Sequence, residues 1–151
     1  MDSGQECGKA LEARLKDFNS FQECIVERVE FSRFRTRLEI VINYIWDDGG
    51  RVRTDIDERQ VLYRLTFDPV FEVRFVSGLT AYQSSHLDEL NWGLNEISRI
   101  TPLDIQQDQE QYAGFPGMIQ GVSVQWSWNT TSAEHDRRID VVFSNLEIAR
   151  I

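Results

Sequence analysis

Residues 122–128 read Val-Ser-Val-Gln-Trp-Ser-Trp, with a large apolar side chain at every even position and a small polar one at every odd position. Successive side chains of a β-strand point to opposite faces of the sheet. The segment therefore predicts a strand with one buried and one solvated face, a pattern typical of antiparallel sheets. We expect Trp126 and Trp128 to belong to the core, because aromatic side chains bury large areas.

The same alternation recurs in several other segments, which are separated by turn signals. Asp47-Asp48-Gly49-Gly50 predicts a tight turn, since Asp and Gly tolerate positive φ. Asp68-Pro69 is expected to interrupt a strand, because proline cannot donate a ladder hydrogen bond. The hairpin partner of the 122–128 strand is expected at 138–143. The strands predicted in this way cover residues 26–34, 37–46, 60–67, 70–76, 120–129, 138–143 and 146–151.

Helical spacing is confined to short stretches. Leu11, Leu15 and Phe18 predict an amphipathic helix over residues 6–19, and Leu87 and Leu90 predict a short one over residues 84–91. Residues 91–103 fit either a continuation of that second helix or, if Gly93 breaks it, a strand over 95–103; we favour the strand. Residues 104–117 are expected to form the longest irregular segment.

These elements predict one α+β domain over residues 1–151, with residues 1–8 frayed at its start. Its architecture is a twisted antiparallel sheet of about six to eight strands, with the N-terminal helix and one further short helix packed on it. The chain has 151 residues, enough for a single core. No apolar window is long enough to span a bilayer and no signal peptide is recognised, so a cytoplasmic location is expected.

The charge distribution narrows the classes of partner. The formal net charge is −9, which repels nucleic acid and anionic membranes and favours solubility or a basic protein partner. Cys7 and Cys24 are the only cysteines, and without a secretion signal we expect free thiols. Neither lies at zinc-ligand spacing from His86 or His135, so no metal and no other cofactor is expected.

No set of residues predicts catalysis. His135 precedes Asp136, but neighbours in sequence seldom reach the geometry of a base and its orienting carboxylate. Cys24 has no adjacent cation that would activate its thiol, and a buried apolar role is expected. Carboxylate pairs lie in predicted turns and helix starts, where a solvated surface role is expected: Asp47/Asp48, Asp55/Asp57 and Asp88/Glu89.

Residues 21–26 (Phe-Gln-Glu-Cys-Ile-Val), followed by a strand, a turn and a second strand through residues 40–46, resemble the opening of a group of small bacterial β-rich proteins. These are immunity-like proteins of polymorphic toxin systems. The later strands at 60–67 and 70–75, and the closing strand before residues 146–148, fall in a similar order. The group often has a His-Asp pair where this chain has Gln22-Glu23, so no polar pair is carried over as a site. The resemblance implies a non-enzymatic domain that binds a cognate toxin.

The leading hypothesis is therefore a protein-binding domain without catalysis that engages a basic partner, such as a toxin, through an acidic surface. Asp104, Asp108 and Glu110 in the irregular segment are the predicted contact residues. The first alternative is a small-ligand pocket protein or enzyme whose cavity is formed by the aromatic face of Tyr44, Trp46, Trp126 and Trp128. The second alternative is a structural homo-oligomer formed by pairing of sheet edges.

Overall fold

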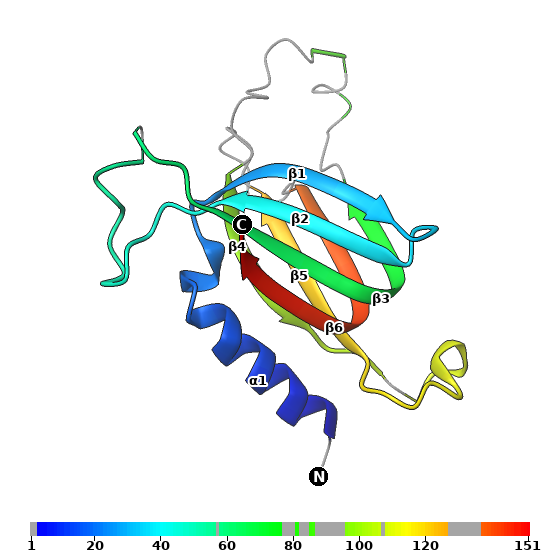
Figure 1. Ribbon diagram of the computed structural model, residues 1–151. Helices are drawn as coiled ribbons and strands as arrows, with labels where there is room; N and C mark the ends of the chain where they lie inside the picture. The colour runs from blue at the N-terminus through cyan, green and yellow to red at the C-terminus, as the bar shows by residue number, and fades with distance from the viewer. Residues whose placement is uncertain are drawn as a thin grey trace.

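The computed structural model describes residues 3–56, 58–76, 81, 85, 86, 96–106, 108–126 and 137–151. Six antiparallel strands form one open sheet in the order β1-β2-β3-β6-β5-β4, with an N-terminal helix beside it (Figure 1). The predicted α+β class and antiparallel sheet are confirmed. The elements are α1 (Ser3–Lys16), the 3-10 helix η1 (Asn19–Phe21), β1 (Ile25–Ser32), β2 (Arg37–Asn43), β3 (Leu62–Val76), β4 (Ile97–Leu103), the 3-10 helix η3 (Glu110–Tyr112), β5 (Gln120–Trp126) and β6 (Arg137–Arg150).

Two long strands, β3 and β6, connect the two halves of the sheet. The first half of β3 pairs with β2, whereas the first half of β6 pairs with β5. The register between β3 and β6 shifts between Val70 and Glu72, a bulge of the kind that bends a strand. Both strands turn at this corner (Figure 1). The β1-β2 hairpin consequently lies in one half of the sheet and the β4-β5 hairpin in the other.

Beside the corner, a carboxylate fastens β2 to β3. Arg37 at the start of β2 donates from Nε and Nη2 to Oδ2 of Asp68, at 3.1 and 2.8 Å. The backbone N–H of Val70 donates to the carbonyl of Thr36 at 2.8 Å. Asp68-Pro69 was expected to interrupt the strand, but β3 runs continuously through it. The bulge beside Pro69, together with the contacts that Arg37 and Thr36 make to the residues on either side of it, explains how the strand pairing tolerates a residue without an N–H.

The two outer strands of the sheet meet at one end. The N–H of Glu23 donates to the carbonyl of Ile97, and the N–H of Ile97 donates to the carbonyl of Cys24, both at 2.8 Å. An isolated antiparallel bridge also joins Ile25 to Glu96. The start of β1 therefore touches the start of β4, and the two halves of the sheet enclose an interior between them.

The core fills most of this interior. Leu11 and Leu15 of α1 and Phe21 of η1 cover one side of it. The helix is tied to the sheet by Arg14, whose Nη1 donates to the carbonyl of Leu146. The largest fully buried side chains are Phe21, Phe67, Phe143, Leu15, Leu38, Ile40, Ile42, Leu65, Ile97, Ile100, Val122 and Val124.

The segment between β4 and β5 is irregular as expected, apart from the short helix η3, and it packs on the outer face of the sheet. Its short helix η3 buries Tyr112 beside Ile119 and Val142. Phe71 of β3 contacts the rings of Tyr112 and Phe115 edge-on, with centroids 5.9 and 4.9 Å apart. The segment also approaches β5 closely, because a Cβ at Gly121 would lie 2.8 Å from Ile105. Apolar periodicity does not reveal this packing, since its aromatic anchors are spread over an irregular backbone.

Several boundaries differ from the expected ones. Helix α1 begins at Ser3 rather than at residue 6, and residues 146–150 continue β6 instead of forming a separate strand. Of the two alternatives for residues 91–103, helix or strand, the described part forms a strand, β4. Ser123 on the polar face of β5 is buried although a solvated face was expected; its cross-strand neighbours are Thr101 of β4 and Asp140 of β6. Most of the predicted helix over 84–91 lies outside the described residues, as do Trp128, His135, Asp136 and the side chain of Trp126.

Candidate functional site

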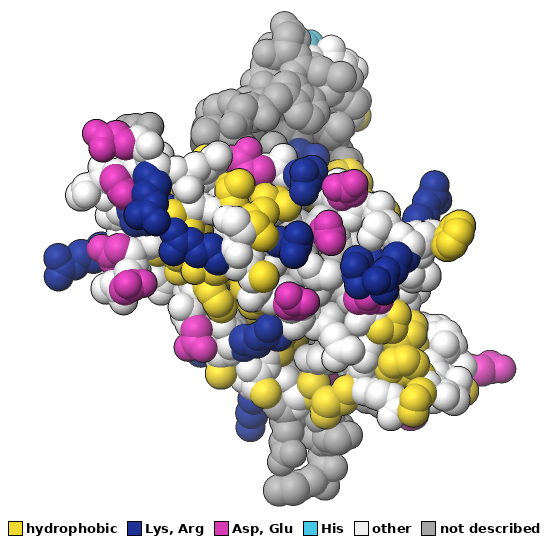
Figure 2. Space-filling view, viewed as in Figure 1, with side chains coloured by type: hydrophobic (Ala, Val, Ile, Leu, Met, Phe, Trp, Pro, Cys, Tyr) yellow, Lys and Arg dark blue, Asp and Glu magenta, His cyan; other side chains and the backbone are white. Residues whose placement is uncertain are grey.

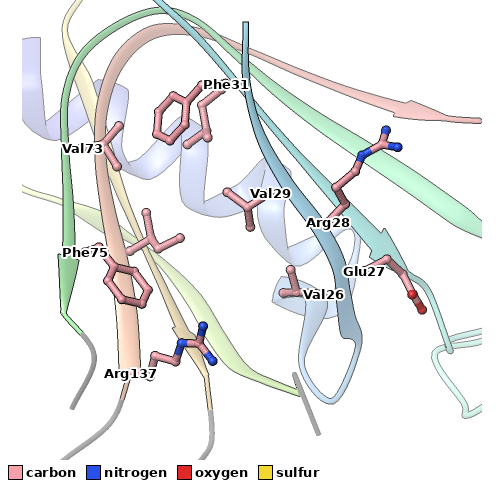
Figure 3. Close-up of a pocket in the computed structure, with 10 residues that line it drawn as sticks. Val26, Glu27, Arg28, Val29, Phe31, Val73, Phe75 and Arg137 are labelled. Carbon is pink, nitrogen blue, oxygen red and sulfur yellow. The ribbon is translucent and has the colours of Figure 1, made fainter. Parts of the chain in front are cut away.

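A cavity of about 460 Å³ lies between the two halves of the sheet. One wall is formed by β1 and β2, and the other by the second half of β3 and the first half of β6 (Figure 3). This volume lies within the range of small-molecule sites. The described residues that line it are Val26, Glu27, Arg28, Val29, Phe31, Leu38, Val73, Phe75, Arg137 and Ile139.

A β-bulge sets which side chains of β1 face the cavity. The register with β2 shifts between Val26 and Arg28. Strict alternation would place Val26 and Val29 on opposite faces, but the extra residue allows both to point inward, as Figure 3 shows. Phe31 follows Val29 on the same face. Alternation along the strand predicted at residues 26–34 accounts for Val29 and Phe31 on one face, but the sequence gave no signal for the bulge that adds Val26.

The mouth of the cavity exposes an unusual amount of apolar surface. Val29, Phe31 and Phe75 are 37, 44 and 52% exposed, although each projects from the inward-facing side of its strand. Deeper in the cavity, Leu38 and Ile139 are buried. Contiguous apolar surface around a hollow is typical of a binding site, because water contact there is unfavourable.

Three of the described residues that line the cavity are charged, and they do not point the same way. Glu27 and Arg28 project from β1 away from the space between the walls, whereas Arg137 extends toward it (Figure 3). Arg28 pairs with Glu30 at 3.3 Å and Glu27 accepts from Asn43 at 3.3 Å. Among the described lining residues, Arg137 is therefore the charge directed at the cavity.

Arg137 occupies an inward-facing position of β6. It is in phase with Ile139, Val141 and Phe143, which belong to the core. Its guanidinium lies over the ring of Phe75, 5.4 Å from the centroid. Partial burial lowers the pKa of this guanidinium, yet arginine stays protonated at neutral pH. Sequence reasoning missed Arg137 because the strand was expected to begin at residue 138; its phase with the apolar positions was the available signal.

The predicted contact residues lie on the outer face. Asp104, Asp108 and Glu110 are all exposed. Asp104 lines two hollows, one of about 230 Å³ that also includes Glu72, Arg74 and Asp140, and one of about 670 Å³ that also includes Lys9 and Glu12. Arg138 donates to Oδ2 of Asp140 at 3.2 Å, whereas Oδ1 is buried without a hydrogen-bond partner in the described structure. Figure 2 shows acidic and basic side chains interspersed on the visible face, so the net charge is not concentrated there in one patch.

The aromatic residues expected to form a cavity have other roles where they are described. Tyr44 packs edge-on against Phe18, Phe21 and Tyr63, with its ring centroid 5.0 Å from that of Tyr63. Nε1 of Trp46 donates to the carbonyl of Gln22 at 2.8 Å. Both residues also line a separate hollow of about 260 Å³. A larger cavity with a mostly apolar lining lies elsewhere, between the two halves of the sheet.

Cys24 is fully buried in the core, and burial raises the pKa of its thiol to about 11. At neutral pH it is a protonated thiol and a poor nucleophile.

Within the described ranges no helix is long and apolar enough to cross a membrane. The described side chains also contain no group of three or more His, Cys, Asp or Glu residues that could hold a metal ion. Comparison with known proteins finds no matching family model, no matching curated protein and no matching solved structure.

Proposed function

We propose that this protein is a non-enzymatic binding protein that holds an apolar small molecule in the cavity between the two halves of its sheet. The single observation that carries the proposal is the cavity of about 460 Å³ with apolar side chains on both walls. A folded sheet that filled its interior completely would leave no such space, since protein interiors are normally close-packed.

The side chains on the walls of the cavity favour ligand binding over catalysis. The inward-facing residues from β1 and β3 offer apolar contact, and each buried methylene of a ligand contributes about 0.8 kcal/mol. The side chains directed at the space include no adjacent nucleophile and base among the described residues, which is the arrangement that covalent catalysis uses. The site therefore supports capture of a ligand through its apolar part.

A homologous series of alcohols from hexanol to decanol tests this function. We expect calorimetric titration to show binding that tightens about three- to fourfold for each added methylene, following the transfer free energy of that group. Saturable binding whose affinity does not depend on chain length would contradict an apolar site. If no alcohol binds, the proposed function is wrong.

A second candidate is the protein-binding role expected from the sequence, with an acidic surface that engages a basic partner such as a toxin. It is favoured by the hollow that brings together the three carboxylates of Glu72, Asp104 and Asp140 with a single arginine, Arg74, among its described lining residues. A lysine or arginine side chain of a partner would complement these carboxylates.

An oligolysine peptide probes this second candidate. Binding that weakens in Asp104→Lys but not in Asp108→Lys would support the hollow, because the two variants change the net charge equally and Asp108 does not line it. Equal weakening in both would indicate only diffuse attraction, which salt screens. No binding by the unmodified protein would count against the candidate.

A further inference from the structure

We propose that the tip of the β1-β2 hairpin, residues 33–36, docks on the surface of an anionic phospholipid membrane. Phe34 enters the apolar layer below the head groups, and the arginines beside it bind lipid phosphates. This inference adds an interaction surface to the function proposed above and does not depend on it. Its basis is a fully exposed phenylalanine between two arginines at a projecting turn.

Phe34 is presented to solvent instead of being packed. Its exposed fraction is 103%, the highest among the large apolar side chains of the described structure. By comparison, Phe31 on the same hairpin is 44% exposed at the mouth of the cavity. The fold therefore shields none of the Phe34 ring from water, and transfer of this ring into an apolar layer is favourable.

The backbone of the tip is held in a conformation that costs free energy. Arg33, Phe34 and Arg35 lie in the left-handed region, with φ of 49, 57 and 68°, which residues other than glycine rarely adopt. The N–H and the hydroxyl of Thr36 donate to the carbonyl of Arg33 at 3.1 and 2.6 Å. The carbonyl of Thr36 accepts from the N–H of Val70 at 2.8 Å. These bonds fix the tip to the sheet, so the fold itself holds Phe34 outward.

The charge of the tip is opposite in sign to that of the whole chain. Arg37 holds the carboxylate of Asp68 at 2.8 Å, and Arg33 lies 3.5 Å from the same oxygen. Arg35 is exposed and pairs with no carboxylate of the described structure. Three arginines therefore share one carboxylate, and Figure 2 shows basic and apolar side chains projecting together where the hairpin ends. Guanidinium groups bind phosphate oxygens through several N–H donors at once.

The formal net charge of −9 is compatible with this contact, because most of it lies away from the tip. Strand β1 has eight residues and is about 26 Å long at the usual rise of a strand. The Debye length is about 8 Å at physiological ionic strength. Carboxylates beyond the near part of the hairpin are thus screened from a surface that touches the tip. Each arginine close to an anionic surface strengthens binding about fivefold.

The tip also lies beside the mouth of the cavity, because one strand connects the two. Val29 and Phe31 of β1 line the mouth, and the tip begins two residues after Phe31. Molecules with an alkyl chain partition into bilayers for the same physical reason that they enter an apolar cavity. A membrane bound at the tip would therefore place the mouth near a store of such molecules.

Cosedimentation with vesicles tests the proposal on the full chain. We expect binding to vesicles of equal parts phosphatidylglycerol and phosphatidylcholine, and at least about fivefold weaker binding to phosphatidylcholine alone. Phe34→Ala should weaken binding to the anionic vesicles at least about tenfold, and Arg35→Gln about fivefold. Both side chains are exposed, so thermal unfolding of both variants should match that of the unmodified protein.

Arg51→Gln is the matched control. It changes the net charge as Arg35→Gln does, but it lies in the loop after β2, at the end of that strand opposite the tip (Figure 1). Its vesicle affinity should stay within about twofold of the unmodified protein. Equal weakening in the two glutamine variants would reduce the effect to net charge and overturn the proposal. Binding that survives Phe34→Ala, or no vesicle binding by the unmodified protein, would also overturn it. The assay contains no alcohol, so the alcohol titration decides the apolar-ligand function separately.

Discussion

Replacing Phe143 with alanine should lower the free energy of unfolding by about 3–5 kcal/mol, the loss typical of a fully buried phenylalanine. The Phe143 and Phe67 rings are both fully buried and meet edge-on, with centroids 4.8 Å apart. They lie beside the corner where β3 and β6 turn, because Val70 pairs with Phe143 and Phe67 with Leu146. The truncation would open a void where the two halves of the sheet are joined. Urea denaturation measures the loss.

Phe75→Ala is the matched control for this prediction. It removes the same ring from β3, but the Phe75 side chain is 52% exposed at the mouth of the cavity. We expect a loss of about 1 kcal/mol, because a half-exposed ring gives up less transfer free energy and leaves no enclosed void. Equal losses in the two variants would show that the corner is no more tightly packed than the mouth, which contradicts the core described above.

Filling the cavity should abolish ligand binding. The double variant Val29→Trp with Val73→Phe adds aromatic volume from both walls, at two strand positions whose side chains point into the space (Figure 3). We expect decanol affinity to fall by at least about a hundredfold, corresponding to the loss of roughly four buried methylenes. The unfolding free energy should change little, since the added rings occupy existing space. Calorimetry and urea denaturation report the two quantities separately.

Glu30→Trp controls for the added aromatic surface. It places an indole on the same strand next to Val29, at an exposed position that is not among the described residues lining the cavity. Decanol affinity should stay within about twofold of the unmodified protein, because no cavity volume is lost. A fall in Glu30→Trp equal to that of the double variant would mean that aromatic substitution of β1 disturbs the fold rather than the site.

Much of the fold followed from alternation of apolar and polar residues. Strands β2 and β5, the tight turn at Asp47–Gly50 and the pairing of β5 with residues 138–143 were predicted from local patterns. Local patterns suffice there because a half-buried strand shows its two faces in sequence. The buried role of Cys24 was predicted on a separate ground, the absence of an adjacent cation that would activate its thiol, and the structure places it in the core.

The cavity was not predictable in this way, for three physical reasons. The bulge after Val26 changes which side chains face inward, and it leaves no sequence signature. The corner at Asp68-Pro69 was interpreted as a break, although backbone and side-chain partners around it hold one continuous strand. Finally, the space lies between halves of the sheet that are distant in sequence, so no single segment encodes its walls.

The structure of the protein with bound decanol, determined by crystallography or by intermolecular NMR contacts, tests the central claim most directly. We expect the alkyl chain to lie between β1 and the second half of β3, in contact with Val29, Phe31 and Val73. An alkyl chain seated instead in the hollow beside Tyr44 and Trp46, or a decanol-soaked protein whose cavity contains only water, would contradict it.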